Sequence, residues 1–210
     1  MTARSSPLRK PTDAYHHGDL RAALIDAALA ELDRGGAEAI GFSSLARRLG
    51  VSQAAPYRHF ADREALLAAV AAKGFRICAA ELRDRAERRS TGSLLSCVAY
   101  GYLEFGLGHV GLYQLMFASR LYQRAAIGSE LQVATDAAFD VVLAAIELAL
   151  EDMTRRRFAL KFWTSLHGVV TLAEQGLLPP KIRQISVSEL IDELVRDTEL
   201  AIAAALTASR

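Results

Sequence analysis

The chain has 210 residues, 51% of them hydrophobic, and a nearly balanced charge, with 25 Lys and Arg against 24 Asp and Glu. These values are ordinary for a globular protein. No run of 18 or more uncharged apolar residues is present, so a membrane-spanning helix is not expected. The N-terminus has no apolar segment of the signal-peptide type, so a cytoplasmic protein is expected. The two cysteines, Cys78 and Cys97, fit no metal-ligand spacing, and no metal or cofactor is expected.

The charge is distributed unevenly along the chain. Residues 1–90 hold 15 Lys and Arg against 11 Asp and Glu, a net charge of +4, whereas the remainder holds 10 against 13, a net charge of −3. The N-terminal part is therefore the better candidate for a polyanionic partner.

Helical periodicity runs through almost everything after Gly18, and no convincing alternating strand is present, so the sequence predicts an all-α fold. Residues 1–15 are expected to form a flexible basic arm, and a first helix is expected over about 19–34. A very short helix over 43–49 should stop at Gly50, and a long helix should run over about 62–89 with Asp62 as its N-cap.

The segment "RRSTGS" (88–93) is the best candidate for a boundary between a small N-terminal unit and a larger C-terminal one. The predicted division is an arm (1–15), a DNA-binding unit (16–62), a connecting helix (63–90) and a ligand-binding and dimerisation unit (91–210). Beyond the boundary, breaker residues separate five expected helices, near 93–107, 110–122, 129–151, 155–177 and 186–207.

The stretch "FSSLARRLGVSQAAPYRHF" has the spacing of a helix-turn-helix, in which a second short helix enters the major groove of DNA. Gly50 supplies the turn, and Ser52 or Gln53 would start the second helix. Tyr57, Arg58 and His59 offer donors suited to phosphate oxygens. The alternative is a plain corner between two helices, with Tyr57 merely packing.

A proline lies inside this second helix. Pro56 lacks an N–H, and its ring disfavours helical geometry at Ala55, so a break is expected there. The cost falls if Pro56 lies in the first turn, which predicts a very short recognition element entered tightly through residues 52–55.

The segment "LARRLGVSQAAPYRHFADREALLAAV" resembles the DNA-binding domain of the TetR family of transcriptional regulators. The resemblance implies that Gln53 and Ala54 face the groove and that Arg63 holds a phosphate. Two departures are Gly41, where the family usually has Ser or Thr, and Ser43, where it often has Arg. The predicted DNA-binding residues are Ser43, Ser44, Ser52, Gln53, Ala54, Tyr57, Arg58, His59 and Arg63.

The C-terminal unit is rich in aromatic side chains that could line an apolar ligand cavity or only fill the core. The predicted ligand-binding residues are Tyr102, Phe105, Tyr113, Met116, Phe117, Phe139, Trp163 and His167. "FWTSLHGVVTLAEQG", like "AYHHGDLR" near the start, also resembles the Trp/His-Gly subgroup of TetR-type ligand domains.

The last two long helices carry broad apolar stripes that predict a partner. The stripe residues are Leu160, Trp163, Val170 and Ala173 on one helix, and Leu190, Leu194, Ile202 and Leu206 on the other. In TetR-like proteins these helices form the homodimer, which implies helices near 155–177 and 186–207 at a two-fold interface.

The expected function is a repressor released from a pseudo-palindromic double-stranded operator by a small-molecule effector. Alternatives are an effector-independent regulator or activator, and an α-helical enzyme using His167 with Glu174. No catalytic motif supports the enzyme.

Overall fold

The computed structural model describes residues 19–118, 121–178 and 185–208, so the expected basic arm lies outside the described residues. Every regular element in these ranges is a helix, which confirms the all-α prediction. The elements are α1 (Leu20–Gly35), η1 (Ala37–Ala39), α2 (Phe42–Leu49), η2 (Pro56–Arg58), α3 (Arg63–Glu87), α4 (Leu94–Gly108), α5 (Val110–Ala118), α6 (Leu121–Arg124), α7 (Glu130–Ala144), α8 (Asp152–Glu174) and α9 (Val187–Ala208).

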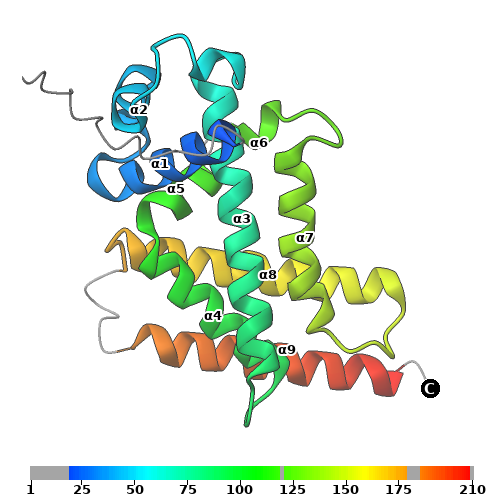
Figure 1. The fold of residues 1–210 in the computed structure, drawn as a ribbon. Coiled ribbons are helices and arrows are strands. Elements are labelled where there is room, and N and C mark those ends of the chain that lie inside the picture. The colour runs from blue at the N-terminus through cyan, green and yellow to red at the C-terminus, as the bar shows by residue number, and fades with distance from the viewer. Residues whose placement is uncertain (1–18, 119–120, 179–184, 209–210) are drawn as a thin grey trace, which may run out of the picture.

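Helix α3 runs through the middle of the molecule and joins its two ends (Figure 1). At one end lie α1, α2 and η2, which we call the head. At the other end α8 and α9 cross beneath α3, while α4, α5 and α7 pack along its length. A single hydrophobic core follows this axis, from Leu24 on α1 through Leu66 and Leu82 on α3 to Leu166 on α8 and Ile191 on α9.

Local chemistry fixes the ends of the helices in the head. The Asp62 carboxylate accepts a hydrogen bond from the Ala65 N–H (2.8 Å), so the predicted N-cap is confirmed. The Asp19 carboxylate caps α1 in the same way through Ala22 N (2.9 Å). Gly50 ends α2 in the left-handed conformation (φ +67°), which a side chain would disfavour, so the predicted turn is also confirmed.

The expected helix over 129–151 is wrong at its C-terminal end. α7 stops at Ala144, and the Arg155 guanidinium donates to the carbonyl of Leu143 (3.0 Å) near that end. α8 then begins at Asp152, earlier than expected, because the Glu151 carboxylate accepts from the N–H groups of Met153 and Thr154. The expected helix over 110–122 corresponds to α5 and the start of α6, and residues 119–120 between them lie outside the described ranges.

The apolar stripes on α8 and α9 lie differently from the prediction. Val170 and Ile202 are buried inside the chain, and Trp163 is half-buried and packs against the core. Leu160 is exposed, and so is Leu200 on α9, which the prediction omitted. Val170 and Ile202 thus serve the chain's own core, whereas Leu160 of the predicted stripe and Leu200 outside it reach the surface. No helix within the described ranges is both long and apolar enough to cross a membrane.

Candidate functional site

The candidate DNA-contacting element between α2 and α3 is very short, as predicted: a tight turn over residues 52–55 leads into a 3-10 helix that takes the place of a second α-helix. The Ala55 N–H donates to Ser52 O (3.0 Å), the Arg58 N–H to Ala55 O (3.2 Å) and the His59 N–H to Pro56 O (3.0 Å). The result is the single 3-10 turn η2. Ala55 lies in the right-handed helical region (φ −62°, ψ −43°), against the usual preference before proline. Pro56 occupies the first helical position, where its missing N–H costs nothing.

Two buried side chains hold this element against the head. Pro56 and Phe60 are both buried, and the Arg21 guanidinium lies over the Phe60 ring, 5.4 Å from its centroid. Between them, Tyr57 is 62% exposed and contacts the buried Phe42 ring edge-on, with 4.7 Å between centroids. This ring contact orients the Tyr57 side chain, most of whose surface stays exposed.

Seven of the nine predicted DNA-contacting residues present exposed side chains on this element and on the start of α2. They are Ser43, Ser52, Gln53, Ala54, Tyr57, Arg58 and His59. Buried Pro56 and Phe60 interrupt this exposed run, so one face is turned outward.

The other two predicted residues already have partners within the chain. The Ser44 hydroxyl donates to Gly41 O (2.8 Å). The Arg63 guanidinium donates from Nε to Ile40 O (2.7 Å) and from Nη2 to Ala37 O (2.5 Å), which ties the start of α3 to the loop before α2. Two of the five guanidinium donors are thereby used, and a phosphate contact through the others stays a prediction.

Arg47 is a candidate that the sequence reasoning missed. It is exposed one turn after Ser43 on α2, so the two share a helix face. Among the described residues it makes no ion pair or side-chain hydrogen bond, whereas its neighbour Arg48 pairs with Glu31 (2.5 Å). The signal was the "RR" pair immediately before the glycine turn.

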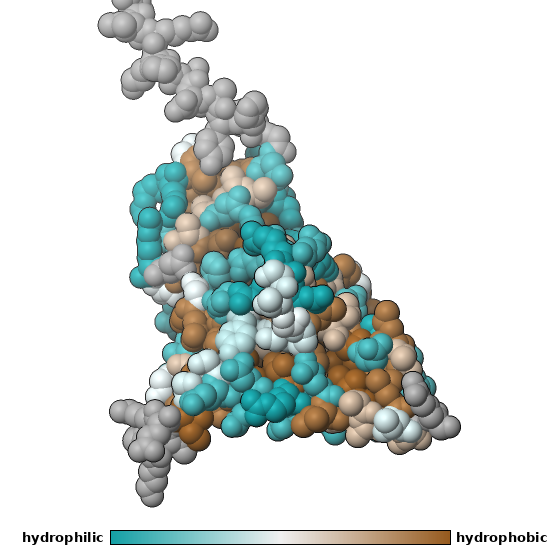
Figure 2. Space-filling view, turned by 90° about the horizontal axis from the view of Figure 1, so that it is seen from below, coloured by the Kyte–Doolittle hydropathy of each residue, from teal (hydrophilic) through white to brown (hydrophobic). Residues whose placement is uncertain are grey.

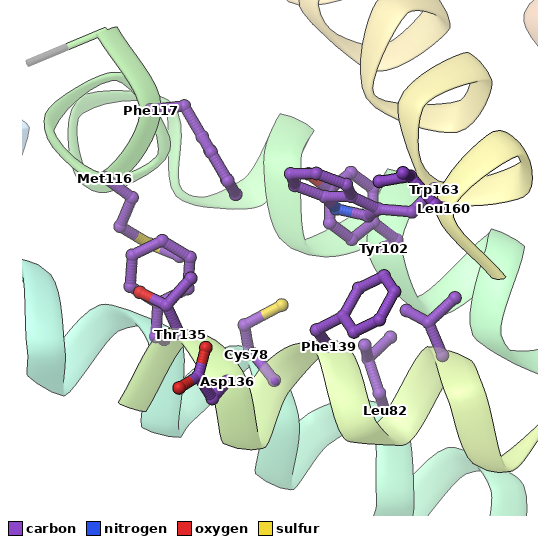
Figure 3. Close-up of a pocket in the computed structure, with 13 residues that line it drawn as sticks. Cys78, Leu82, Tyr102, Met116, Phe117, Thr135, Asp136, Phe139, Leu160 and Trp163 are labelled. Carbon is purple, nitrogen blue, oxygen red and sulfur yellow. The ribbon is translucent and has the colours of Figure 1, made fainter. Parts of the chain in front are cut away.

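The second candidate site is an apolar cavity of about 370 Å³ enclosed by α3, α4, α5, α7 and α8 (Figure 3). Its volume suits a small organic ligand. Five predicted residues line it: Tyr102, Met116, Phe117, Phe139 and Trp163. Sequence reasoning missed the other lining residues, which are Phe75, Cys78, Leu82, Thr135, Asp136, Ala138, Val142 and Leu160.

The three remaining predicted ligand residues lie behind this wall. Phe105 is buried in the core, and Tyr113 and His167 form a polar cluster with Tyr102. The His167 Nδ1 atom lies 2.6 Å from the Tyr113 hydroxyl and 3.0 Å from the Tyr102 hydroxyl. Thr171 completes the cluster, with its hydroxyl 3.4 Å from that of Tyr113. Of the four, only Tyr102 also lines the cavity.

Burial favours the uncharged forms of His167, Tyr102 and Cys78. Desolvation lowers the pKa of His167 and raises the pKa of Tyr102 well above 10. Burial, reinforced by the Glu81 charge, raises the pKa of the Cys78 thiol to about 12, so the thiol is protonated and poorly nucleophilic.

Glu174, the carboxylate considered as the partner of His167 in an enzyme, makes a different hydrogen bond. The Glu174 side chain accepts a hydrogen bond from Gln114 Nε2 (2.6 Å), and the hydrogen bonds of the His167 ring go to Tyr102, Tyr113 and Thr171. The pair expected for acid–base chemistry is therefore not assembled among the described contacts. The described residues also contain no group of three or more side chains able to hold a metal ion.

The head and the cavity helices meet at two further contacts. The Glu130 carboxylate, at the first residue of α7, accepts from Arg21 on α1 (2.5 Å) and from Arg76 on α3 (2.9 Å), an arrangement we call the clasp. Partial burial raises the pKa of Glu130, but the two arginines outweigh it and the net pKa is lowered. Gly111 on α5 lies so close to α1 that an added Cβ would be 2.9 Å from Leu32 O.

Comparison with known protein families gives two matches along the chain. Residues 24–70 match the family described as bacterial regulatory proteins, tetR family, and residues 95–198 match a tetracyclin repressor-like C-terminal domain. No curated protein matches the sequence.

Solved structures show the same fold along nearly the whole chain. A protein of unknown function from Rhodococcus sp. RHA1 is 30% identical, covers 93% of this chain and 98% of its own, and superposes with a TM-score of 0.68. A possible TetR family transcriptional regulator from Streptomyces coelicolor A3(2) is 19% identical over 90% of this chain and 98% of its own (TM-score 0.56). The transcriptional regulator FadR from Bacillus subtilis, in complex with stearoyl-CoA, is 13% identical over 85% and 97% (TM-score 0.60).

Proposed function

This chain belongs to the TetR family of bacterial transcriptional regulators, and we propose that it is a repressor that leaves its operator when a small molecule occupies the cavity. The observation that carries the proposal is the double role of α3. Its N-terminal end follows the exposed recognition element directly, and Phe75, Cys78 and Leu82 further along it form one wall of the cavity. A ligand in the cavity would therefore contact α3, the helix that connects directly to the head.

The recognition element, residues 52–60, supports DNA binding because one part of it suits base contacts and the other suits phosphate contacts. Gln53 and Ala54 precede the buried proline and are exposed, and glutamine suits bidentate contact with adenine while alanine suits the thymine methyl group. Tyr57, Arg58 and His59 follow it and offer donors for phosphate oxygens.

The clasp offers a route from the cavity to the head. α7 contributes Thr135, Asp136 and Phe139, among others, to the cavity wall, and Glu130 at the start of the same helix binds Arg21 on α1. A ligand that favours a different position of α7 or α3 would change the conformer population of the head. The required differential affinity is small, since about 1.4 kcal/mol is a tenfold change.

A homodimer through α8 and α9 would supply the second reading head. Met153, Leu172 and Leu200 are exposed on these two helices, at 62%, 43% and 64%. Figure 2 shows hydrophobic surface gathered toward the C-terminal end of α9 in the view from below. A two-fold axis there would present two recognition elements to a pseudo-palindromic site.

The dimer is tested by mass measurement in solution. Leu200→Glu should shift the protein toward monomer in size-exclusion chromatography with light scattering. Ile127→Glu, at a 97% exposed position in the loop before α7, should leave the mass unchanged. A monomeric wild type, or a Leu200→Glu variant with the wild-type mass, would contradict the proposed interface.

DNA binding is tested by fluorescence anisotropy with fragments upstream of the chain's own gene and with DNA selected from random sequence. A specific binder should lose affinity linearly on a log–log plot as salt rises, because Lys and Arg side chains release counterions from the phosphates. Equal affinity for selected and unselected DNA would refute operator recognition.

Two finer assignments belong to the same proposal. Stacking of Trp163 on His167, with 5.9 Å between ring centroids and a 29° interplanar angle, supports the Trp/His-Gly subgroup. A DNA partner supports the cytoplasm as the compartment.

A further inference from the structure

The cavity contains one polar group whose hydrogen-bonding capacity the protein does not use well, and that group is the Tyr102 hydroxyl. Tyr102 is 3% exposed and lines the cavity beside Trp163 (Figure 3), so bulk water does not satisfy it. Its hydrogen-bond partners within the described chain are the hydroxyl of Tyr113 and Nδ1 of His167.

The Tyr102 proton lacks a short acceptor within this cluster whichever ring nitrogen of His167 carries the imidazole proton. If Nδ1 carries the lone pair, it has room for one strong donor, and the Tyr113 hydroxyl at 2.6 Å occupies it, since two lone pairs would repel at that distance. If Nδ1 carries the proton, it donates and cannot accept from Tyr102 at all. In both tautomers the Tyr102 proton is left with the Tyr113 oxygen at 3.3 Å, a long O–H···O contact.

The cavity wall has few other hydrogen-bond donors. The Thr135 hydroxyl donates to Leu131 O (2.9 Å), and the Trp163 indole N–H faces the Tyr102 hydroxyl, whose pKa it acts to lower. The Cys78 thiol is only a weak donor. Tyr102 and the adjacent Trp163 are therefore the strong donors among the described lining side chains, and the Tyr102 proton has only a long contact within the chain.

The charges of the lining residues restrict the charge that a ligand can carry. No Lys, Arg or His is among the described lining residues, so a buried anion would lack a counter-charge. The sole ionisable carboxylate among them, Asp136, is exposed and stays hydrated. The remaining wall is aromatic rings, aliphatic side chains and a thioether.

We propose that the effector is an uncharged, largely apolar molecule with one hydrogen-bond acceptor, such as a carbonyl or ether oxygen, that accepts from the Tyr102 hydroxyl. The inference rests on the proposed function, in which this cavity binds the effector. Accepting the Tyr102 proton replaces a long contact by a short one, so Tyr102 selects acceptor-bearing ligands over pure hydrocarbons of the same shape.

Four probes that share two phenyl rings test this. Benzophenone carries a carbonyl acceptor, diphenylmethane has none, 4-benzoylbenzoate adds a carboxylate and benzhydrylamine is a cation. Isothermal titration calorimetry on the full chain gives their dissociation constants for the wild type, for Tyr102→Phe and for Tyr100→Phe. Tyr100 is the matched control, because its hydroxyl bonds Asp192 (2.7 Å) and does not line the cavity.

The decisive quantity is the ratio of the benzophenone affinity to the diphenylmethane affinity, because it cancels the change in packing. The ratio should fall about 2- to 13-fold in Tyr102→Phe, the range of one net hydrogen bond, and should be kept in Tyr100→Phe. Both charged probes should bind the wild type more weakly than benzophenone. An unchanged ratio in Tyr102→Phe, or tighter binding of either charged probe, overturns the inference.

A cavity-filling variant separates this inference from the proposed function. Ala138→Trp places a large ring in the cavity and should abolish binding of both neutral probes, with circular dichroism checking that the variant folds. If Ala138→Trp abolishes binding while Tyr102→Phe keeps the ratio, the cavity binds ligands and only the acceptor preference is wrong. If neither neutral probe binds the wild type, the ligand role of the cavity fails as well.

Discussion

Replacing Glu130 by glutamine should loosen the clasp between the head and α7 without removing bulk. The carboxylate makes two ion pairs, with Arg21 at 2.5 Å and Arg76 at 2.9 Å, and all three side chains are 39–48% exposed. Exposed pairs contribute about 0.2–1 kcal/mol each, and glutamine keeps an acceptor, so we expect a loss of about 1 kcal/mol in the free energy of unfolding. For a chain of this size that corresponds to about 2–4 °C in Tm.

The assay is urea unfolding of the wild type, Glu130→Gln and Glu104→Gln at low and high salt. Glu104 pairs with Arg85 on the part of α3 far from the head, so its variant removes a surface ion pair without touching α1. The deficit of Glu130→Gln should shrink at high salt, since exposed charges are screened. Only Glu130→Gln should also change operator affinity.

The pH dependence gives an independent check on the clasp. Because the pKa of Glu130 is lowered from 4.5 in the folded chain, its contribution is present above about pH 4.5 and is lost as pH falls through the lowered value. Glu130→Gln should flatten this part of the stability profile. A variant with the wild-type unfolding free energy at every salt concentration and pH would refute the view that the clasp holds the head.

Three further outcomes are expected. Tyr57→Phe should weaken binding to all DNA sequences by a similar factor while Gln53→Ala relaxes base preference, as competition with selected and random DNA would show; the reverse pattern would contradict the proposed roles. Gly111→Ala should destabilise the chain by about 1–3 kcal/mol in urea unfolding, because its Cβ would meet a backbone oxygen of α1 at 2.9 Å, whereas exposed Gly108→Ala should not destabilise it. Desolvation lowers the pKa of His167, so stability should decline as pH falls below about 6.5, and His167→Gln should remove that part of the decline.

The sequence predicted the existence of the helices better than their ends. The N-cap at Asp62 and the helix end at Gly50 could be predicted because a cap and a left-handed glycine act on their immediate neighbours. The end of α7 at Ala144 was not, since part of what satisfies its last carbonyls comes from Arg155, on the next helix. A long-range side-chain donor of this kind leaves no periodic signal.

Only part of the cavity wall could be predicted from the sequence, for a similar reason. Its aromatic residues on α4, α5 and α8 stand out in composition, but Phe75, Cys78 and Leu82 on α3 read as an ordinary buried stripe. Burial and cavity lining produce the same spacing on a helix, and only the position of the facing helices distinguishes them. The same ambiguity placed Val170 and Ile202 on an expected interface, although the chain's own core covers both.

The length of α3 explains why a small ligand can matter to a distant reading surface. From Cys78 in the cavity wall to Arg63 at the head is 15 residues, about 22 Å of helix at 1.5 Å per residue. A tilt of about 5° at the cavity would therefore carry the head by about 2 Å, which is the scale of a hydrogen bond to a base edge. Arg63 is tied to the carbonyls of Ala37 and Ile40, so the head would follow the end of α3 instead of slipping on it. On this reasoning, cutting the Arg63 contacts should reduce the coupling between ligand and operator even though Arg63 lies far from the cavity.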